Sequence, residues 1–310
     1  MSQNTTLVIG GTGFIGRRLV PALIARGDNV RVMSRRPALD GILPNSPFLH
    51  ACVADYGDLG SLRKALVGVH TVFHLASSTQ PKSSNDDMKC DIQSNLLPSV
   101  GLMNEVVRQG KARIVFVSSG GTIYGIPKQT PITESHPMEP LCSYGIVKLA
   151  IEKYLHMYEA LKGLDYRVLR VSNPFGPTQH LNPAQGVVGN FIHQMAAGKR
   201  LSVWGDGSIV RDYIYIDDVV RALILAGRHT GDGRVFNIGS GTGHRLIDII
   251  DIIGLALGKR PEVDFAPSRS FDIPINVLDT TAAHRELGWS SEITFEEGVR
   301  MTVESLFHAK

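Results

Sequence analysis

Apolar residues in this chain gather in short runs of strand-forming residues, and the stretches between them carry apolar positions at helical spacing. The runs predict strands at residues 7–11, 29–34, 71–77, 113–119, 166–173 and 234–240. Helical spacing predicts helices at residues 17–27, 61–68, 96–110 and 148–163. Nearly continuous apolar strands that alternate with helices are typical of a parallel sheet covered on both faces. The pattern therefore predicts an α/β fold with a doubly wound parallel sheet.

The strand–helix rhythm changes after residue 173, where shorter elements and a Gly-, Asn- and Gln-rich loop begin. We expect one domain from residues 1–173, to which the chain returns at about 210–238. Residues 174–209 and 239–310 are expected to form a smaller, interwoven C-terminal domain that covers a substrate.

The first predicted strand ends in a glycine-rich turn, LVIGGTGFIG at residues 7–16, and a helix follows directly. Strand, glycine turn and helix in this order hold a dinucleotide pyrophosphate in Rossmann folds. Gly10 allows the sharp turn, Gly13 lets backbone amides approach the phosphates, and Gly16 lets the helix pack on the strand. The free N–H groups at the helix start attract the anion. We therefore predict a dinucleotide-binding Rossmann domain.

Composition limits the other functions that the chain could have. Its 310 residues are 43% hydrophobic and 20% charged, and the net charge of +3 is too small and dispersed for a nucleic-acid surface. Cys52, Cys90 and Cys142 lie far apart without a CxxC motif, and the eleven histidines lack metal-ligand spacing. No leader and no apolar stretch near ~18 residues is found. We predict a cytoplasmic protein with free thiols that binds no metal, nucleic acid or membrane.

Tyr144 and Lys148 are four residues apart at the start of a predicted helix, which places them on one face. A tyrosine acts as an acid or base near neutral pH only when its phenolate is stabilised, because its ordinary pKa is about 10. A lysine ammonium one turn away and a bound nicotinamide cation both lower that pKa. The pair follows the glycine turn by ~130 residues and a strand ending in SSGGTIYG (118–125), which predicts a catalytic pair.

At this point the chain resembles the extended short-chain dehydrogenase/reductases, in particular the NAD(P)-dependent nucleotide-sugar epimerase/dehydratase family of the UDP-galactose 4-epimerase type. The resemblance covers essentially the whole chain. It rests on GGTGFIG (10–16), Asp55, HLAS (74–77), Asn95, SSGGTIYG (118–125), Tyr144 with Lys148, LRVSNPFGP (169–177), WGDGSIVRDYIYIDD (204–218), FNIGSG (236–241) and RSFD (269–272).

The resemblance implies roles for residues around the cofactor. Tyr144 is the expected acid/base at the sugar C4 hydroxyl, and Lys148 is expected to bind the nicotinamide ribose and depress the tyrosine pKa. Asp55 is expected to meet the adenine. The cofactor-binding set it implies is Gly10, Gly13, Phe14, Ile15, Gly16, Arg35, Arg36, Asp55, Tyr56, Leu75, Ala76, Ser77, Asn95, Ser118, Tyr144 and Lys148.

The same resemblance implies a sugar-nucleotide substrate, linked to UDP or dTDP. Asn173 is expected to hold its phosphates, and Arg211 with Arg269 to clamp the pyrophosphate, since a planar guanidinium fits two phosphate oxygens. Asp272 is expected to accept hydrogen bonds from the nucleotide ribose. The substrate-binding set it implies is Ser119, Thr122, Asn173, Val187, Val188, Trp204, Arg211, Tyr213, Arg269 and Asp272. The base and the sugar stay open.

Two departures from the family pattern follow the fourth predicted strand. Gly120 stands where such enzymes place a catalytic Ser or Thr, so the substrate hydrogen bond must come from Thr122 or Ser119, and we predict Thr122. Dehydratases of the group carry an acidic pair at the next two positions, which are Gly121 and Thr122 here. The sequence therefore argues against a dehydratase.

A third departure concerns the cofactor. NAD-specific members end the second strand with an Asp that binds the adenosine ribose, whereas this chain has Ser34, Arg35 and Arg36. Two guanidiniums fit a 2′-phosphate, which favours NADP(H), although arginines here also stack on adenine and NAD stays open. The full-length resemblance favours a 4-epimerase, and the arginines favour an NADPH-dependent 4-ketoreductase. A catalytically silent NAD(P)-binding protein is the third alternative, and the intact Tyr144 and Lys148 pair argues against it.

Two helices are expected to form a subunit interface, at about residues 96–109 and 144–162. Apolar side chains of the second cover more of its circumference than one sheet-facing stripe needs. They are Leu149, Ile151, Tyr154, Leu155, Tyr158 and Leu161. The resemblance implies that these helices meet their copies in a four-helix bundle, so we expect a homodimer.

Overall fold

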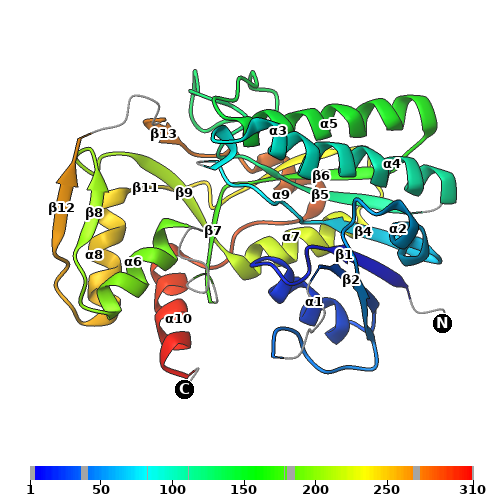
Figure 1. The fold of residues 1–310 in the computed structure, drawn as a ribbon. Helices are drawn as coiled ribbons and strands as arrows, with labels where there is room; N and C mark the ends of the chain where they lie inside the picture. The colour runs from blue at the N-terminus through cyan, green and yellow to red at the C-terminus, as the bar shows by residue number, and fades with distance from the viewer. Residues whose placement is uncertain are drawn as a thin grey trace. The chain divides into compact units, whose positions relative to one another are not determined.

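The computed structural model describes residues 4–35, 41–81, 83–110, 112–177, 179, 186–267 and 273–308. The chain, drawn in Figure 1 with colours that follow residue number, divides into two compact units. The first unit comprises Met1–Ile123, Pro140–Arg170 and Val220–Phe236, and the second comprises Tyr124–Glu139, Val171–Val219 and Asn237–Lys310.

A seven-stranded sheet forms the centre of the first unit, with the strand order β10-β6-β5-β4-β1-β2-β3. Its strands are β1 (Thr5–Ile9), β2 (Asn29–Ser34), β3 (Leu49–Val53), β4 (Val69–His74), β5 (Arg113–Ser119), β6 (Tyr166–Val171) and β10 (Val235–Ile238). The pairs from β3 through β5 are parallel. All six strands predicted from apolar runs are confirmed, and so is the doubly wound α/β fold.

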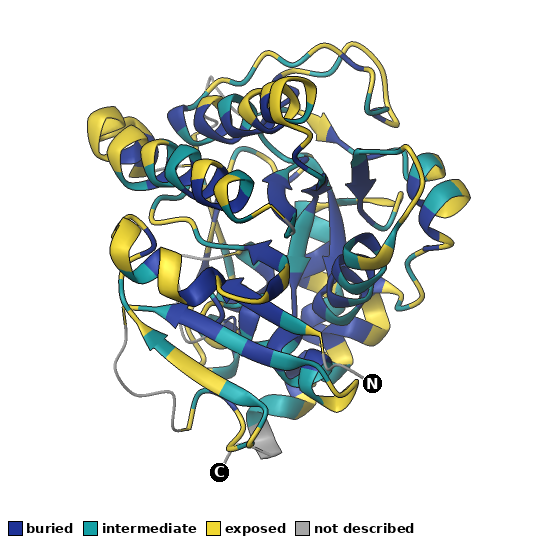
Figure 2. Ribbon diagram, turned by 90° about the vertical axis from the view of Figure 1, so that its right-hand side faces the viewer, coloured by how far each residue is buried: buried dark blue, intermediate teal, exposed yellow. Residues whose placement is uncertain are grey.

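One strand of this sheet, β3, was not predicted. It lies at one edge of the sheet, and three of its five residues are exposed while none is buried. By contrast, Leu7, Val8, Val115, Phe116 and Val168 of the inner strands are almost fully buried, and Figure 2 shows the inner strands in dark blue. Edge position alone does not explain this, because β10 at the other edge has an apolar run and three buried residues. Strand β3 lacks the run because most of its side chains face solvent.

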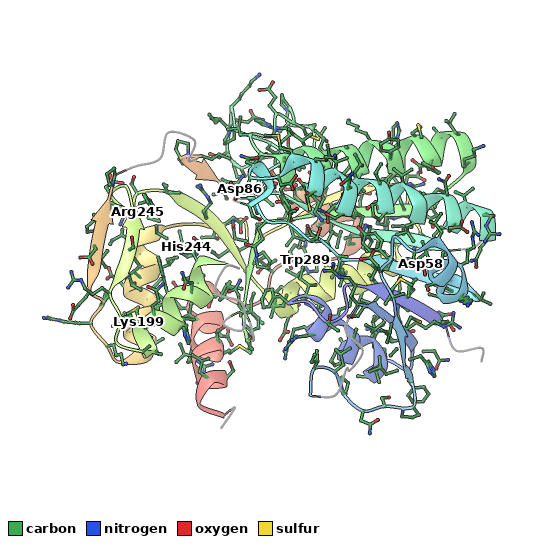
Figure 3. All side chains as sticks on the ribbon, in the orientation of Figure 1. Asp58, Asp86, Lys199, His244, Arg245 and Trp289 are labelled. Atoms are coloured by element: carbon green, nitrogen blue, oxygen red, sulfur yellow. The ribbon has the colours of Figure 1, made fainter. Side chains whose placement is uncertain are left out.

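Helices flank this sheet and connect its strands. They are α1 (Gly16–Ala25), α2 (Leu59–Leu66), α3 (Met88–Asp91), α4 (Leu97–Gln109), α5 (Ser143–Lys162) and α7 (Ile216–Arg228), with a 3₁₀ turn η1 (Ser83–Asn85) and a π-helical turn η2 (Ile92–Leu96). Asp58, labelled in Figure 3, caps α2 by accepting hydrogen bonds from the N–H groups of Gly60 and Ser61. Gly110 and Gly163 end α4 and α5 in the left-handed conformation, which favours glycine.

The second unit contains shorter strands and four helices among its described residues. The strands are β7 (Asn173–Phe175), β8 (Leu201–Trp204), β9 (Val210–Tyr215), β11 (Gly243–Arg245), β12 (Val263–Ala266) and β13 (Ile275–Asn276). The helices are α6 (Val187–Ala196), α8 (Leu246–Leu257), α9 (Thr281–Leu287) and α10 (Phe295–His308). Strand β9 pairs with β7, β11 and β13, and β8 pairs with β12.

The units differ from the expected domain boundaries in three places. Residues 124–139, 171–173 and 210–219 fall in the second unit, although we expected 1–173 and about 210–238 to form the first domain. The reason for the last difference is that all the strand partners of β9 belong to the second unit. The division by function stays a prediction.

Candidate active site

The sheet has a topological switch point between β1 and β4. From β1 the chain continues to β2 and β3 on one side, and β4, β5 and β6 follow on the other. In open α/β sheets, the crevice at the carboxyl ends of such strands binds the ligand. Gly10 follows β1 and Leu75, Ala76 and Ser77 follow β4, so the predicted glycine turn and the HLAS segment both lie at this crevice.

The glycine turn leaves no room for side chains. Gly10 has a φ of +87°, and a Cβ there would lie 2.9 Å from the Ala76 nitrogen. A Cβ on Gly16 would lie 2.5 Å from the Gly10 oxygen, so Gly16 allows α1 to start directly against the turn. Gly13 donates its N–H to the Gly10 carbonyl at 3.0 Å, and Phe14 and Ile15 lead into α1. This cradle of bare backbone at a helix start fits a dinucleotide pyrophosphate.

Arg35 and Asp55 lie near each other at the ends of β2 and β3. The Arg35 Nε is 3.9 Å from the Asp55 Oδ2, and both side chains are exposed, which makes a weak ion pair. Asp55 also accepts a hydrogen bond from the Gly57 N–H at 2.8 Å. Both groups therefore remain accessible to the adenosine end of a cofactor, while Arg36 lies outside the described residues.

Two residues of the expected cofactor-binding set, Tyr56 and Ser118, donate their hydroxyls to acceptors inside the protein. Tyr56 is buried, and its hydroxyl donates to the carbonyls of Ser94 and Asn95 at 3.2 and 3.3 Å. Burial raises the pKa of Tyr56 to about 12. The Ser118 hydroxyl is buried and donates to Glu152 at 2.5 Å. Internal acceptors hold both hydroxyl protons, and the place of Tyr56 and Ser118 in the cofactor-binding set stays a prediction.

Asn95 lies in the π-helical turn η2, and its side chain holds the loop that follows β4. Its Oδ1 accepts the Ser78 N–H at 2.9 Å, and its Nδ2 donates to Asp91 at 2.8 Å. Asn95 thereby fixes the segment after Leu75, Ala76 and Ser77 at the mouth of the crevice. Its predicted contact with the cofactor remains a prediction.

Tyr144 and Lys148 lie in the first turns of α5, as the spacing predicts. Lys148 is only 4% exposed, and its Nζ donates to the Val117 carbonyl at 2.8 Å. The same Nζ lies 4.7 Å from the centroid of the Phe116 ring and 5.6 Å from that of the Tyr144 ring. The ammonium is therefore close to the tyrosine ring and fixed at the end of β5.

Burial acts on both members of this pair. It raises the pKa of Tyr144, and the nearby Cys142 and Asp91 raise it further. Burial lowers the pKa of Lys148 to about 8, against the attraction of the Asp91 and Glu152 carboxylates. Each neutral form is thus favoured by burial, so a Tyr144 phenolate depends on cationic charge close to its ring.

The turn after β5 carries the hydroxyls that we considered in place of a Ser or Thr at Gly120. The Thr122 Oγ1 is buried and has no hydrogen-bond partner among the described residues. A Cβ on Gly145 would lie 3.3 Å from the Thr122 Cβ, so this threonine packs against the first turn of α5, beside Tyr144. Ser119 contributes its carbonyl to the Ile123 N–H at 3.3 Å. The choice of Thr122 over Ser119 stays a prediction.

The predicted substrate residues of the second unit gather on β7 and β9. Asn173 pairs in register with Tyr213, and its Nδ2 donates to the Asp212 carbonyl at 2.8 Å. Arg211 donates to the Ile273 carbonyl at 2.6 Å and stands in register with His244, which is labelled in Figure 3.

Other members of the predicted substrate set differ in exposure. Tyr213 is buried against Phe295, with ring centroids 5.4 Å apart, and its predicted contact with the substrate stays a prediction. Val188 is buried in α6, and Val187 at the start of that helix is half-buried. Trp204 is 44% exposed at the end of β8. Arg269 and Asp272 lie outside the described residues.

Sequence reasoning missed the residues that hold the start of α5. The Tyr144 N–H donates to the Ser84 Oγ at 3.0 Å, and the Ser143 N–H donates to the Asn85 Oδ1 at 2.9 Å. The Ser143 hydroxyl donates to Asp91 at 2.7 Å. These partners lie in the polar segment 83–91, which reads as an ordinary loop because its contacts are more than fifty residues distant in sequence.

In the part of the chain that the structure describes, no group of three or more His, Cys, Asp or Glu residues is placed to hold a metal ion. None of the described helices is both long enough and apolar enough to cross a membrane.

The chain is similar to known proteins over nearly its whole length. The sequence profile of the NAD dependent epimerase/dehydratase family matches residues 6–239. Over 306 residues, the chain is 36% identical to the UDP-glucose 4-epimerase of Mycolicibacterium smegmatis, and the match covers 96% of this chain and 97% of that protein.

Two solved structures share the fold. The UDP-glucose 4-epimerase of Thermotoga maritima with UDP-glucose has a TM-score of 0.92 and 32% identity, covering 98% of this chain and 99% of that one. The UDP-glucose 4-epimerase of Thermus thermophilus in complex with NAD has a TM-score of 0.90 and 32% identity, covering 99% of this chain and 100% of that one. The chain belongs to the NAD-dependent epimerase/dehydratase family of extended short-chain dehydrogenase/reductases.

Proposed function

We propose that this enzyme is a nucleotide-sugar 4-epimerase that acts on a UDP- or dTDP-hexose through a transient 4-keto intermediate. The observation that carries the proposal is the Tyr144 and Lys148 pair, one helical turn apart at the carboxyl end of β5, in the unit that holds the glycine cradle. The M. smegmatis and T. maritima relatives, both UDP-glucose 4-epimerases, support it.

The residues fit a nicotinamide dinucleotide, which supplies a hydride acceptor and donor when bound. Gly10, Gly13 and the start of α1 would hold its pyrophosphate, and Lys148 its nicotinamide ribose. We propose that Tyr144 removes the proton from the C4 hydroxyl and later returns it. The Lys148 ammonium stabilises the phenolate, and the Thr122 hydroxyl donates to the substrate oxygen.

On the substrate, we propose that Asn173 and Arg211, together with Arg269, hold the phosphates, and that Asp272 binds the nucleotide ribose. The exposed Trp204 ring offers a face for the base. A panel of UDP- and dTDP-sugars tests this assignment, because Arg211→Ala is expected to weaken binding of every member, whichever base and sugar it carries.

An NADPH-dependent 4-ketoreductase is the second candidate, and Arg35 favours it. Its guanidinium is 75% exposed at the end of β2, which suits a 2′-phosphate. A reductase exchanges its cofactor every turnover, whereas an epimerase regenerates its own and can retain it. The two candidates therefore differ in what the purified protein carries.

Denaturing the pure protein and quantifying the released nucleotide separates the candidates. Near-stoichiometric NAD, with interconversion of a 4-epimeric pair of UDP- or dTDP-sugars and no added cofactor, supports the epimerase. A protein that releases no cofactor, binds NADPH and reduces a 4-keto sugar once per NADPH is a reductase. Neither activity on the sugar panel would contradict both candidates.

We also propose a homodimer built on α4 and α5. These helices lie side by side (Figure 1), and the Tyr158 hydroxyl of α5 donates to the Asn104 Oδ1 of α4 at 2.7 Å. Ile151, Leu155 and Tyr158 are buried, so these members of the expected apolar set belong to the core.

A neighbouring face of α5 keeps a second apolar stripe. It consists of Ile146, Tyr154, Met157 and Leu161, all exposed and spaced so that they share one face. A second copy of the chain is the occupant that this stripe fits, because a two-fold axis pairs it with itself. Sedimentation at micromolar concentration is expected to show twice the 33.8 kDa chain mass, and Leu161→Glu is expected to shift it to monomer. A monomeric wild-type protein would contradict this proposal.

A further inference from the structure

Asp91 is the last residue of α3 and is completely buried. Its Oδ1 accepts the Thr79 hydroxyl at 2.6 Å and the Asn95 Nδ2 at 2.8 Å, and its Oδ2 accepts the Ser143 hydroxyl at 2.7 Å. A buried carboxylate is costly unless it is hydrogen-bonded on both oxygens, and here both are.

The three donors come from three different segments of the crevice. Thr79 follows the HLAS segment at the end of β4, Asn95 lies in the π-helical turn, and Ser143 immediately precedes Tyr144. One carboxylate therefore ties the loop after β4 and the π-helical turn to the residue next to the tyrosine.

The start of α5 depends on such outside partners. Its N-cap residue, Cys142, makes no side-chain capping bond. The first N–H groups of a helix have no partner within the helix. Here the N–H groups of Ser143 and Tyr144 donate to Asn85 and Ser84, which belong to the same segment as Asp91. The segment 84–91 thus caps the helix that carries Tyr144.

A second carboxylate, Glu152, lies near Lys148, but its charge is already balanced. The Arg170 guanidinium donates to the Glu152 Oε2 at 2.7 Å, and Ser118 donates to the Oε1. The three donors of Asp91 are all neutral groups. Two carboxylates therefore act on Lys148, and they differ in their partners. Glu152 is paired with a guanidinium, whereas the described donors of Asp91 are neutral.

We propose that Asp91 is a positioning residue of the reaction, which orients Tyr144 through Ser143 and provides the counter-charge for the Lys148 ammonium. The inference rests on the proposed function, because it assigns Asp91 a part in proton transfer at Tyr144. It adds to the tyrosine–lysine pair a buried anion that acts through hydrogen bonds and charge without touching the substrate.

The charge has a consequence for pH dependence. The Asp91 carboxylate raises the pKa of both Lys148 and Tyr144, so its removal lowers both. The other ionisable groups near the pair are the paired Glu152, the Cys142 thiol and His74, whose pKa burial lowers to about 3, so that it stays neutral. Since the reaction needs a Tyr144 phenolate and a Lys148 ammonium, both limbs of the pH–activity profile move to lower pH when the charge is lost.

The experiment compares Asp91→Asn, Ser143→Ala and a control, Asp86→Asn, in the intact enzyme. Asp86 is an exposed carboxylate of the same segment and is labelled in Figure 3. Asp91→Asn is expected to lower kcat about tenfold to a hundredfold, to change KM by less than about twofold, and to move the profile by about one pH unit. Ser143→Ala keeps the charge, so it is expected to lower kcat without moving the profile. Asp86→Asn is expected to leave both unchanged.

Hydrogen–deuterium exchange provides a readout besides activity. The amides of residues 143–146 are expected to exchange faster in both Asp91→Asn and Ser143→Ala than in the wild type or in Asp86→Asn. An active enzyme in which Asp91→Asn leaves kcat and the profile unchanged would overturn the inference. A wild type without epimerase activity, but with faster exchange in both variants, would overturn the proposed function and retain the capping role.

Discussion

Two fully buried aspartates, Asp91 in the first unit and Asp212 in the second, are bonded in opposite ways. Asp212 accepts hydrogen bonds from three backbone N–H groups, those of Ser240 at 2.8 Å, Leu278 at 3.2 Å and Gly241 at 3.3 Å. The hydroxyls of Ser172 and Ser240 also donate to it. Asp91 accepts only side-chain donors among its described contacts.

The difference indicates that Asp212 stabilises the fold, whereas Asp91 holds side chains of the proposed active site. Backbone N–H groups must find partners when they are buried, and Asp212 is the acceptor for three of them, at Ser240, Gly241 and Leu278. The donors of Asp91 are side chains, and one of them belongs to Ser143, the residue before Tyr144. Loss of Asp212 should therefore reduce stability, and loss of Asp91 should reduce rate.

The largest effect on kcat is expected at Tyr144, the residue that Asp91 is proposed to position. Tyr144→Phe is expected to lower kcat by ~10²–10⁴, because the proton at C4 loses its acceptor, while sugar-nucleotide binding changes little. Steady-state kinetics with isothermal titration measures both quantities. Tyr154→Phe, an exposed tyrosine of the same helix, is the matched control and should retain wild-type kcat. If Tyr144→Phe turns over within tenfold of wild type, Asp91 has no acid/base to position.

Asp212→Asn is expected to have the largest effect on stability, a loss of about 2–5 kcal/mol in the free energy of unfolding. The asparagine side chain replaces one carboxylate oxygen, which accepts hydrogen bonds, with an NH₂ group, which donates them. At least one backbone N–H that donates to Asp212 therefore loses its acceptor. Urea denaturation measures the loss. Asp206→Asn changes an exposed carboxylate that also accepts a backbone N–H, from Ser208, and should stay within about 0.5 kcal/mol. A fully stable Asp212→Asn enzyme with lowered kcat would reverse the comparison.

The sequence was informative where structure depends on neighbours along the chain. Six apolar runs located the five inner strands and the edge strand β10, and the spacing of Tyr144 and Lys148 placed both at the start of α5. The strands of the second unit are two to six residues long and are defined by distant partners, as when Ile275 pairs with Val210. Such pairings leave no periodic pattern to detect.

The same limit applies to the site. The glycine turn is local and was predicted, whereas the bonds of Asp91 to Ser143 and of Asp212 to Leu278 join residues 52 and 66 positions apart. The sequence also could not show that Tyr56, Ser118 and Tyr213 are buried. A polar residue in a strand or turn gives the same sequence pattern whether its side chain contacts the protein or a ligand.

Lys148 provides a test of how much stability the first unit gives up for its site. Its pKa is about 8 in the folded protein, below the ordinary 10.5. Below pH 8 both states carry the ammonium and folding bears the whole cost of burying it. Between pH 8 and 10.5 the unfolded state binds more protons, so wild-type stability rises with pH.

Lys148→Met is therefore expected to stabilise the cofactor-free protein at pH 7 by up to about 3 kcal/mol, with an advantage that shrinks toward pH 10. Denaturation at pH 7, 8.5 and 10 measures this trend. Lys153→Met, at an exposed position of the same helix, should show no such pH dependence. A pH-independent difference for Lys148→Met would mean that the buried ammonium costs the fold nothing.

The smallest effect is expected at Arg35, an exposed residue of the first unit. Its side chain is 75% exposed and its Nε lies 3.9 Å from the Asp55 Oδ2. Solvent and salt therefore screen the attraction between its guanidinium and a 2′-phosphate. Arg35→Ala is expected to weaken NADP(H) binding about tenfold, or about 1.4 kcal/mol, and NAD(H) binding less than twofold. Fluorescence titration with both cofactors measures the ratio, and Arg26→Ala, an exposed arginine after α1, serves as the control. Equal losses for the two cofactors would mean that Arg35 stacks on the adenine, and the argument for a reductase would lose the residue that supports it.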